Sequence, residues 1–302
     1  MPESKSASEL KRIARTLELV FPDARPVAPL RFVDQGFRSI AVEAAGGVLM
    51  RVGTSVEAAA GYELETRALP FIAKQVDAAV PAPQWYTKPN RDLPFGALGY
   101  PKLPGSNPKW GVEPPRRFAL SLGRFMAQLH SAPVDQAIDS GISEVNSFER
   151  LISAEDIVMP ALRRRLSAPE FVHLLAWWEE FRSDDRMQLY ELSVCHHDLW
   201  HGNLLIGKSG ELAGVLDWAH VEVGDRAHDF AATRYFGEQF NRQLIDAYLE
   251  NGGSFGVEDQ YRAQKFWGRR EFGGIAWAIE NSDENELEEG IGKLRRGPLF
   301  QK

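Results

Sequence analysis

The sequence predicts an α+β protein with two lobes, an N-terminal lobe built on a sheet and a mainly helical lobe after it. The chain has 302 residues, which is longer than a usual single domain. Short apolar runs bounded by turn residues occupy residues 30–52 and 94–100, as expected of strands. From about residue 114 the apolar residues recur with a helical period instead. We therefore expect an antiparallel sheet lobe over residues 1–103 and a helical lobe over residues 104–302.

The first segment is expected to be an amphipathic helix. Ser6 and Glu9 have the spacing of a capping box, in which each residue satisfies the backbone N–H of the other. Apolar residues follow with a helical period and stop before Pro22, so the helix should end there.

The next elements are expected to form the sheet. Residues 30–42 and 48–52 are predicted strands, joined at Gly46–Gly47, a pair that favours a hairpin. Residues 56–73 are rich in Ala, Glu and Leu, which predicts a helix. Residues 94–100 are predicted to be a further short strand.

The second lobe is predicted from helical periodicity. Helices are expected over residues 118–130, 148–166, 171–181, 241–249, 260–267 and 275–280.

Residues 194–230 are the part of the sequence that indicates a chemical function. They contain H-x-D-L-x-x-x-N, with Asp198 and Asn203 five residues apart, and Asp217 follows a second apolar run. This order is that of a phosphoryl-transfer catalytic loop and a later metal-binding acid. Such a reaction needs one carboxylate to orient the attacking hydroxyl, and oxygen ligands to hold Mg²⁺ against the phosphates. Asp198 is therefore the expected catalytic base, with Asn203 and Asp217 as expected magnesium ligands.

The segment between the two metal-binding candidates is expected to be a β-hairpin. Residues 204–206 and 212–216 are short apolar runs separated by Gly-Lys-Ser-Gly, a turn composition. A hairpin would return Asp217 to the side of Asn203.

The block HHDLWHGNLL, followed by GVLDWAHVEVGDRAHDFA, resembles the aminoglycoside phosphotransferase family, the small-molecule branch of the protein-kinase-like fold. The resemblance implies a two-lobed kinase-like fold and transfer of the γ-phosphate of ATP or GTP to a hydroxyl of a small molecule. An aminoglycoside or macrolide antibiotic, a sugar or an amino alcohol are the expected acceptors, and resistance and metabolism remain open as roles. The resemblance also gives Asp198 the role of base, Asn203 and Asp217 the role of magnesium ligands, and Asp225 and Asp229 mainly structural roles.

Two residues of the first lobe match the family's phosphate-binding pair. Arg51 lies on a predicted strand where protein kinases have a lysine that reaches the α- and β-phosphates. Glu65 begins E-T-R-A-L, which resembles the family's E-x-x-x-L, so it is the expected partner of Arg51, with Glu63 as the alternative. A solvent-facing strand arginine and a fully exposed helical face are the competing interpretations.

Two backbone segments are expected to contact the nucleotide. The loop of residues 34–39 has one glycine where a protein kinase has three, so Gly36 and Ser39 are candidates for phosphate contact, and a plain hairpin turn is an equal alternative. Residues 101–105 resemble the family's hinge, where backbone atoms of Pro101 and Leu103 would bind the base. Proline can offer only its carbonyl there.

Five of the seven histidines lie between residues 196 and 228, which raises a rival interpretation. His197 and His201 are four residues apart, and on a helix both would lie on one face as zinc ligands. Trp200 and Gly202 interrupt such a helix, and a zinc site would leave Asn203 without a role. A zinc hydrolase is therefore the less favoured alternative, and a catalytically silent nucleotide-binding protein is the other.

Composition limits the partners. A formal net charge of -7 argues against nucleic acid, and no apolar run has the length of a membrane span. The one cysteine, Cys195, cannot form an internal disulfide, and the N-terminal residues have no apolar segment of a signal peptide. We expect a cytoplasmic monomer or homodimer that binds a small molecule, with Cys195 as a buried packing residue and not a nucleophile.

Six acidic residues lie between Glu280 and Glu289. The family resemblance implies that acids of the C-terminal helices hold the amino groups of a substrate. A solvated acidic turn is the alternative interpretation.

Overall fold

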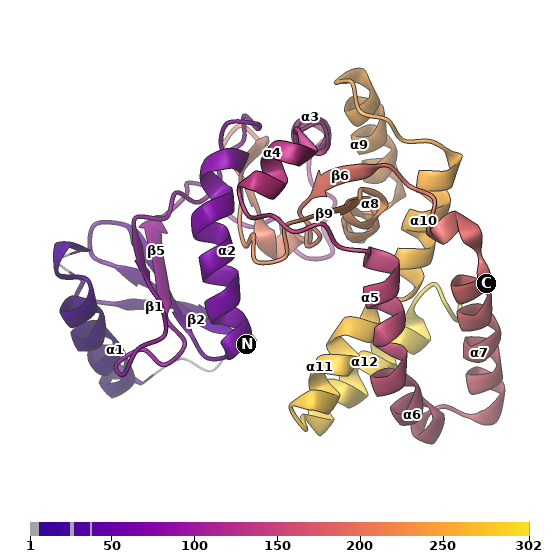
Figure 1. Cartoon of the computed structure of the whole chain (residues 1–302), viewed down its shortest axis with the longest axis horizontal. Helices are drawn as coiled ribbons and strands as arrows, with labels where there is room; N and C mark the ends of the chain where they lie inside the picture. The colour runs from indigo at the N-terminus through magenta and orange to yellow at the C-terminus, as the bar shows by residue number, and fades with distance from the viewer. Residues whose placement is uncertain (1–5, 25–26, 37, 302) are drawn as a thin grey trace.

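The N-terminal lobe contains an antiparallel sheet (Figure 1). The sheet has five strands in the order β1-β2-β3-β5-β4. This computed structural model describes residues 6–24, 27–36 and 38–301, so residue 37 of the predicted nucleotide loop lies outside the described residues. The strands are β1 (Arg31–Gln35), β2 (Ser39–Ala44), β3 (Val48–Gly53), β4 (Trp85–Thr87) and β5 (Ala97–Pro101).

The β2–β3 hairpin turns where the glycine pair predicts it. Ala44 pairs with Val48, and the turn between them places Gly46 at φ 84° and Gly47 at φ 76°. These left-handed conformations are accessible to glycine at no steric cost. The hairpin brings Arg51 onto the strand next to β5, where it pairs with Leu98.

Helix α1 (Ala7–Val20) covers the outer part of this lobe, and its predicted capping box is present. The Glu9 N–H donates to the Ser6 hydroxyl, and the Ser6 N–H donates to the Glu9 carboxylate. The buried face of α1 carries Leu17, which belongs to the same apolar cluster as Val42 and Met50 of the sheet.

Helix α2 (Val56–Ile72) stands between the sheet and the helical lobe (Figure 1). Its first half places Tyr62 in a small cluster with Leu98 and Tyr100 of the sheet. Its second half places Leu69 and Ile72 in the large core of the helical lobe. One helix is therefore shared by the cores of both lobes.

The helical lobe also contains two small antiparallel ribbons, which carry the motif-bearing loops. Strand β6 (Leu192–Cys195) pairs with β9 (Glu222–Asp225), and β7 (Leu204–Ile206) pairs with β8 (Leu212–Val215). The helices are α3 (Arg116–His130), α4 (Val134–Asp139), α5 (Ser147–Ser153), α6 (Glu155–Arg165), α7 (Ala168–Ser183), α8 (Ala227–Thr233), α9 (Glu238–Glu250), α10 (Val257–Gly268), α11 (Glu271–Glu280) and α12 (Glu284–Arg296). Single 3-10 turns lie at Pro22–Ala24, Asp185–Met187, His201–Asn203 and Arg234–Phe236.

Helices α3 and α9 pack at close range in the centre of this lobe. A Cβ atom added to Gly123 of α3 would lie 2.5 Å from the carbonyl oxygen of Leu244 and 2.9 Å from the Cβ of Ala247, both on α9. Gly123 is therefore the residue that allows the two helix backbones to approach each other.

Several boundaries differ from the sequence predictions. The helix predicted over residues 148–166 is two helices that meet at Ala154, and the predicted 94–100 strand begins only at Ala97. Strand β4 and helices α4 and α12 were not predicted. The acidic run is not a turn: Asp283 caps α12 by accepting a hydrogen bond from the Glu286 N–H, and acids in the first turn of a helix are stabilised by the helix dipole.

The chain leaves the sheet at Pro101 and enters α3 at Arg116, while the functional division at residue 103 stays a prediction. Over the described ranges, every helix is too short or too polar to serve as a membrane span.

Candidate active site

The predicted catalytic loop, residues 196–203, follows β6 and is held in place by one buried carboxylate. Asp229 accepts hydrogen bonds from the backbone N–H of His196, at 2.9 Å, and of His197, at 2.6 Å. Its Oδ2 atom also lies 3.1 Å from the Nε2 atom of His130. The His196 ring reaches the carbonyl of Leu216, at 3.0 Å, and so ties this loop to the end of the β7–β8 hairpin. The contacts of Asp229 and His196 thus hold the loop in place, in keeping with the structural role that the family resemblance implies for Asp229.

Asp198 is fixed by the side chain of Asn203. The Asn203 Nδ2 atom donates to the Asp198 carboxylate at 2.6 Å and to the Asp198 carbonyl at 2.9 Å. Burial, and next the negative charge of Asp217, raise the pKa of Asp198 to about 7. A carboxylate with this pKa is suited to accept a proton near neutral pH.

The β7–β8 hairpin returns Asp217 to this place. The Leu216 N–H donates to the Asn203 carbonyl at 2.8 Å, so the residue after Leu216 begins beside the catalytic loop. Asp217 has a left-handed backbone with φ 57°, a conformation that few residues other than glycine, Asn and Asp adopt. Burial alone would raise the pKa of Asp217, but the positive charge of Arg51, the nearby His220 and His196, and the Arg51 hydrogen bond together outweigh it and hold this pKa below its usual value.

Arg51 joins the two lobes. Its Nη1 atom donates to Glu65 at 2.7 Å and its Nη2 atom donates to Asp217 at 3.0 Å. Arg51 is 9% exposed, so the interpretation as a solvent-facing strand arginine is wrong. Glu63, the alternative partner, instead forms an ion pair with Lys88 at 3.3 Å.

The loop before β2 reaches the same region through a residue that the sequence analysis did not select. The Gly36 N–H donates to the Ser39 carbonyl at 3.1 Å, which closes a turn. Arg38, inside this turn, approaches the Nε2 atom of His220 at 3.1 Å. Burial, and next the charge of Arg38, lower the pKa of His220 to about 4, so the ring is neutral and can accept from Arg38. The contacts of Gly36 and Ser39 with phosphate remain predictions.

The segment after β5 is tied to the catalytic loop. Lys102 N–H donates to the Gly47 carbonyl at 2.8 Å, which fixes the chain on either side of Pro101 and Leu103. Asn107 donates from Nδ2 to the carbonyls of Gly202, at 2.7 Å, and Leu204, at 3.0 Å. Asn107 carries no motif, and its role appears only in the structure. Base binding by Pro101 and Leu103 stays a prediction.

Comparison with known proteins decides the family. A family model described as a phosphotransferase enzyme family matches residues 30–265, which is most of the chain. The chain belongs to the phosphotransferase enzyme family. The resemblance read from residues 196–229 is thereby confirmed.

Solved structures of phosphotransferases share the fold of this family member. The GDP and kanamycin complex of the aminoglycoside phosphotransferase APH(2")-IIIa is similar with a TM-score of 0.83 and 20% identity, over 94% of this chain and 97% of that chain. Macrolide 2'-phosphotransferase MphH from Brachybacterium faecium is similar with a TM-score of 0.72 and 22% identity, over 95% of this chain and 99% of that chain. The predicted two-lobed, kinase-like α+β fold is confirmed.

A sequence relative adds less, because it has no assigned activity. The uncharacterized protein YcbJ of Bacillus subtilis (strain 168) is 28% identical over 174 residues, which are 52% of this chain and 55% of that protein. This phosphotransferase family member thus spans about half the length of that relative.

The histidine pair of the zinc interpretation does not form a helical ligand face in this family member. His197 has φ 66°, and its ring stacks on His228, whereas the His201 ring lies between Trp110 and Trp200. Within the described ranges, one group of three metal-ligand side chains lies close together, and it contains neither histidine of that pair: His130, Cys195 and Asp229. The thiol of Cys195 is fully buried and donates to the Ser193 carbonyl, and burial raises its pKa, so it is the packing residue that was predicted.

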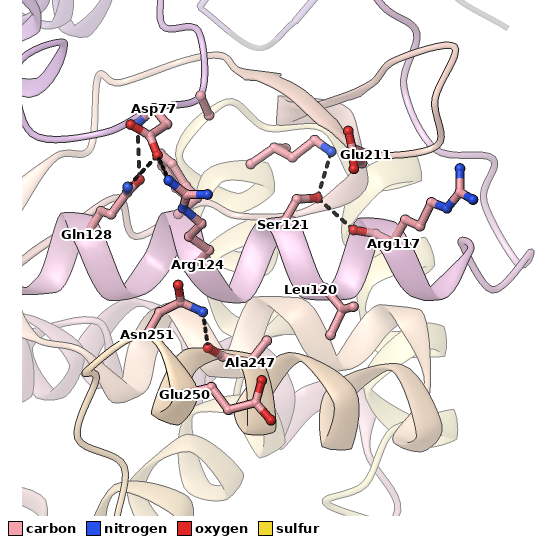
Figure 2. Close-up of a pocket in the computed structure, with 13 residues that line it drawn as sticks. Asp77, Arg117, Leu120, Ser121, Arg124, Gln128, Glu211, Ala247, Glu250 and Asn251 are labelled. Carbon is pink, nitrogen blue, oxygen red and sulfur yellow. Dashed lines mark hydrogen bonds and ion pairs between the residues drawn. The ribbon is translucent and has the colours of Figure 1, made fainter.

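Two pockets are prominent in the helical lobe of this family member. One, of about 490 Å³, lies between α3, the start of β8 and α9, where Asp77, Arg124 and Gln128 point toward one another (Figure 2). It includes no predicted site residue.

The other pocket, of about 480 Å³, adjoins the catalytic loop and is called the aromatic pocket below. Its lining residues are Trp110, Trp200, His201, Tyr235, Arg270, Glu271, Glu289, Lys293 and Arg296.

Proposed function

We propose that this chain is a small-molecule kinase that transfers the γ-phosphate of ATP or GTP to a hydroxyl group of its substrate. In this proposal residues 1–103 bind the nucleotide, and residues 104–302 carry the catalytic loop and the substrate site. Family membership supports phosphoryl transfer as the reaction class.

The observation that carries the proposal is an ion pair that joins the two lobes beside the carboxylates of Asp198 and Asp217. Arg51 of the sheet binds Asp217 of the helical lobe, and Asp217 lies near enough to Asp198 to raise its pKa. The Asn203 amide keeps the Asp198 carboxylate in one orientation. In the proposed reaction Asp198 accepts the hydrogen bond, and then the proton, of the attacking hydroxyl, while Arg51 contacts phosphate oxygens.

The donor set fits a magnesium ion. Asp217 supplies a carboxylate whose side chain is 41% exposed. The Asn203 Nδ2 atom donates to Asp198. The amide oxygen of Asn203 has no hydrogen bond to any described residue, so it is available to a cation. A hard cation prefers these oxygen ligands, and Mg²⁺ would neutralise charge on the phosphates when bound. Asp217 and Asn203 would hold it.

The test compares the natural chain with Asp198→Asn in phosphate transfer from ATP and from GTP with Mg²⁺. The acceptor panel contains aminoglycosides, macrolides, sugars and amino alcohols. We expect kcat to fall by about 10²–10⁴-fold, because proton acceptance is lost, while nucleotide affinity stays within about twofold.

The matched control is Asp246→Asn, an exposed carboxylate on α9 outside the site, which should leave turnover unchanged. Turnover in Asp198→Asn equal to that of the natural chain would remove Asp198 from the role of base. Nucleotide binding without transfer to any acceptor would favour the catalytically silent alternative.

A further inference from the structure

A row of aromatic rings begins at the catalytic loop and forms one wall of the aromatic pocket. The rings follow one another in space, although they come from three distant segments of the chain. Ring centroids are 4.6 Å apart for Trp200 and His201, 4.7 Å for His201 and Trp110, and 5.1 Å for Trp110 and Tyr235. Trp200 is only two residues from Asp198, so the wall starts next to the proposed reacting position.

These rings are not simply part of the apolar core. Trp110 is 62% exposed and Trp200 is 39% exposed, although both are large apolar side chains. Exposed rings that line one pocket indicate a binding surface for an apolar or flat ligand. The far end of the wall is stiffened, because Tyr235 packs edge-on against Trp267 at 4.6 Å and the Arg270 guanidinium lies 3.9 Å from the Trp267 ring centroid.

The lining of the pocket also carries an excess of positive charge. Three cations line it, Arg270, Lys293 and Arg296, against two carboxylates. Each carboxylate is already engaged: Glu271 forms an ion pair with Arg270 at 3.0 Å, and Glu289 forms one with Lys293 at 2.8 Å. Arg296 makes no ion pair or hydrogen bond to any residue in the described part of the chain, and it is exposed.

Of the other acids of the predicted acidic run, Glu286 interacts electrostatically with Glu271 and Lys293, but it does not line the aromatic pocket. Glu284 and Glu288 both form ion pairs with Arg165, at 2.7 and 3.0 Å, outside the aromatic pocket. A substrate with several ammonium groups would therefore meet cationic side chains and carboxylates that already form ion pairs. A substrate with one anionic group would instead find Arg296, which interacts with Glu271 and Glu289 through their charges but forms no hydrogen bond or ion pair among the described residues.

We propose that the aromatic pocket selects a flat, largely apolar acceptor that carries a single anionic group, and that it disfavours polycationic amino sugars. The inference rests on the proposed function, because it names the substrate class of that same site. Trp110, with Trp200, would contact the flat face of the ligand, and Arg296 would pair with its anionic group.

The experiment measures ligand binding alone, by calorimetry on the full chain without nucleotide. Three probes share one fused ring and differ in charge: 2-naphthoate, 2-naphthamide and 2-naphthylmethylammonium. We expect 2-naphthoate to bind about tenfold more tightly than the ammonium probe, because it alone pairs with Arg296. Arg296→Gln should reduce that ratio to about twofold or less, and Trp110→Ala should weaken all three probes by about tenfold.

Both substituted side chains are exposed, so neither variant should disturb folding. The matched controls are Arg242→Gln, which is 69% exposed on α9, and Val257→Ala, which is 80% exposed at the start of α10. Both should bind the probes as the natural chain does. The proposal is overturned if the ammonium probe or kanamycin binds as tightly as 2-naphthoate, if Arg296→Gln keeps the preference, if Trp110→Ala changes nothing, or if 2-naphthoate does not bind at about 10 mM.

The binding result is independent of the proposed kinase activity. A chain that binds 2-naphthoate through Arg296 and yet phosphorylates no acceptor keeps the pocket assignment and contradicts the proposed function. A chain that phosphorylates an amino sugar and prefers the ammonium probe keeps the kinase function and contradicts the pocket assignment.

Discussion

Arg51 has a role that depends on the shape of its side chain as well as its charge. The planar guanidinium donates in two directions at once, to Glu65 in its own lobe and to Asp217 in the other. Burial alone would lower the pKa of Arg51, but the two carboxylates outweigh it and hold this pKa well above its usual value, so the side chain remains charged. A lysine in this place would offer a single ammonium group, which cannot reproduce the fork.

We therefore expect Arg51→Lys to weaken ATP and GTP binding by about tenfold, or roughly 1–2 kcal/mol, while the chain still folds. Calorimetric titration of both nucleotides measures the first effect, and thermal unfolding measures the second. Arg12→Lys on the exposed side of α1 is the control and should change neither. Unchanged nucleotide affinity in Arg51→Lys would argue against phosphate contact by this residue.

The sequence predicts the candidate site residues that lie within one stretch of the chain, residues 198–217. Asp198, Asn203 and Asp217 could be selected because the spacing of a phosphoryl-transfer loop is local and chemically specific. Arg38 and His220 could not, because their contact joins residues 182 positions apart and has no sequence pattern of its own. The same holds for Trp110, whose partner rings come from two other segments.

Helix α3 depends on one glycine for its packing against α9. Gly123→Ala should lower the free energy of unfolding by about 1–3 kcal/mol, because the added methyl group would meet the Leu244 carbonyl at 2.5 Å and force the helices apart. Urea unfolding measures the change.

The matched control is Gly273→Ala in α11, where an added Cβ would have no atom within 4 Å. That substitution should raise the free energy of unfolding by about 0.5–1 kcal/mol, because alanine favours a helix. Equal effects of the two substitutions would contradict the close α3–α9 packing.

Elements with strong local signals were predicted, and those that depend on distant partners were not. Helix α1 has a capping box and a regular apolar face, so both its ends were placed within two residues. Strand β4 has three residues and exists because Trp85–Thr87 pair with β5. The strand propensity of three residues is a weak signal, so pairing with β5 determines their conformation.

The whole molecule should lose stability in acid partly through a buried histidine. The His228 ring lies 4.5 Å from His197 and 4.6 Å from Phe266, and its buried Nε2 atom has no hydrogen-bond partner among the described residues. Burial, and next the charges of Arg150 and Arg269, lower its pKa to about 3. The unfolded chain, with a histidine pKa of about 6.5, therefore binds more protons between these values.

By linkage, this stabilising contribution is complete above about pH 6.5 and is lost as the pH falls toward 3. We expect His228→Phe, which keeps the ring stack, to reduce the loss of unfolding free energy between pH 7 and pH 5 by about 2 kcal/mol. Urea unfolding at the two pH values measures this difference. An unchanged pH dependence would show that His228 is not the titrating group.

At the scale of the molecule, length and composition predicted two lobes but not how their cores connect. Helix α2 contributes Tyr62 to the apolar cluster of the sheet and Ile72 to the core of the helical lobe. The sequence of α2 predicts only a helix. Its contribution to both apolar clusters follows from how the two lobes pack against it.

Because the side chain of Cys195 is buried, the natural chain is a convenient background for spectroscopic labelling. Cys195 is the single cysteine, its side chain is 0% exposed, and burial raises the pKa of its thiol, so little of the reactive thiolate is present. A cysteine introduced on the pocket rim or on the β2–β3 turn can therefore carry a fluorophore or spin label at one defined place, with no need to remove a native sulfur first.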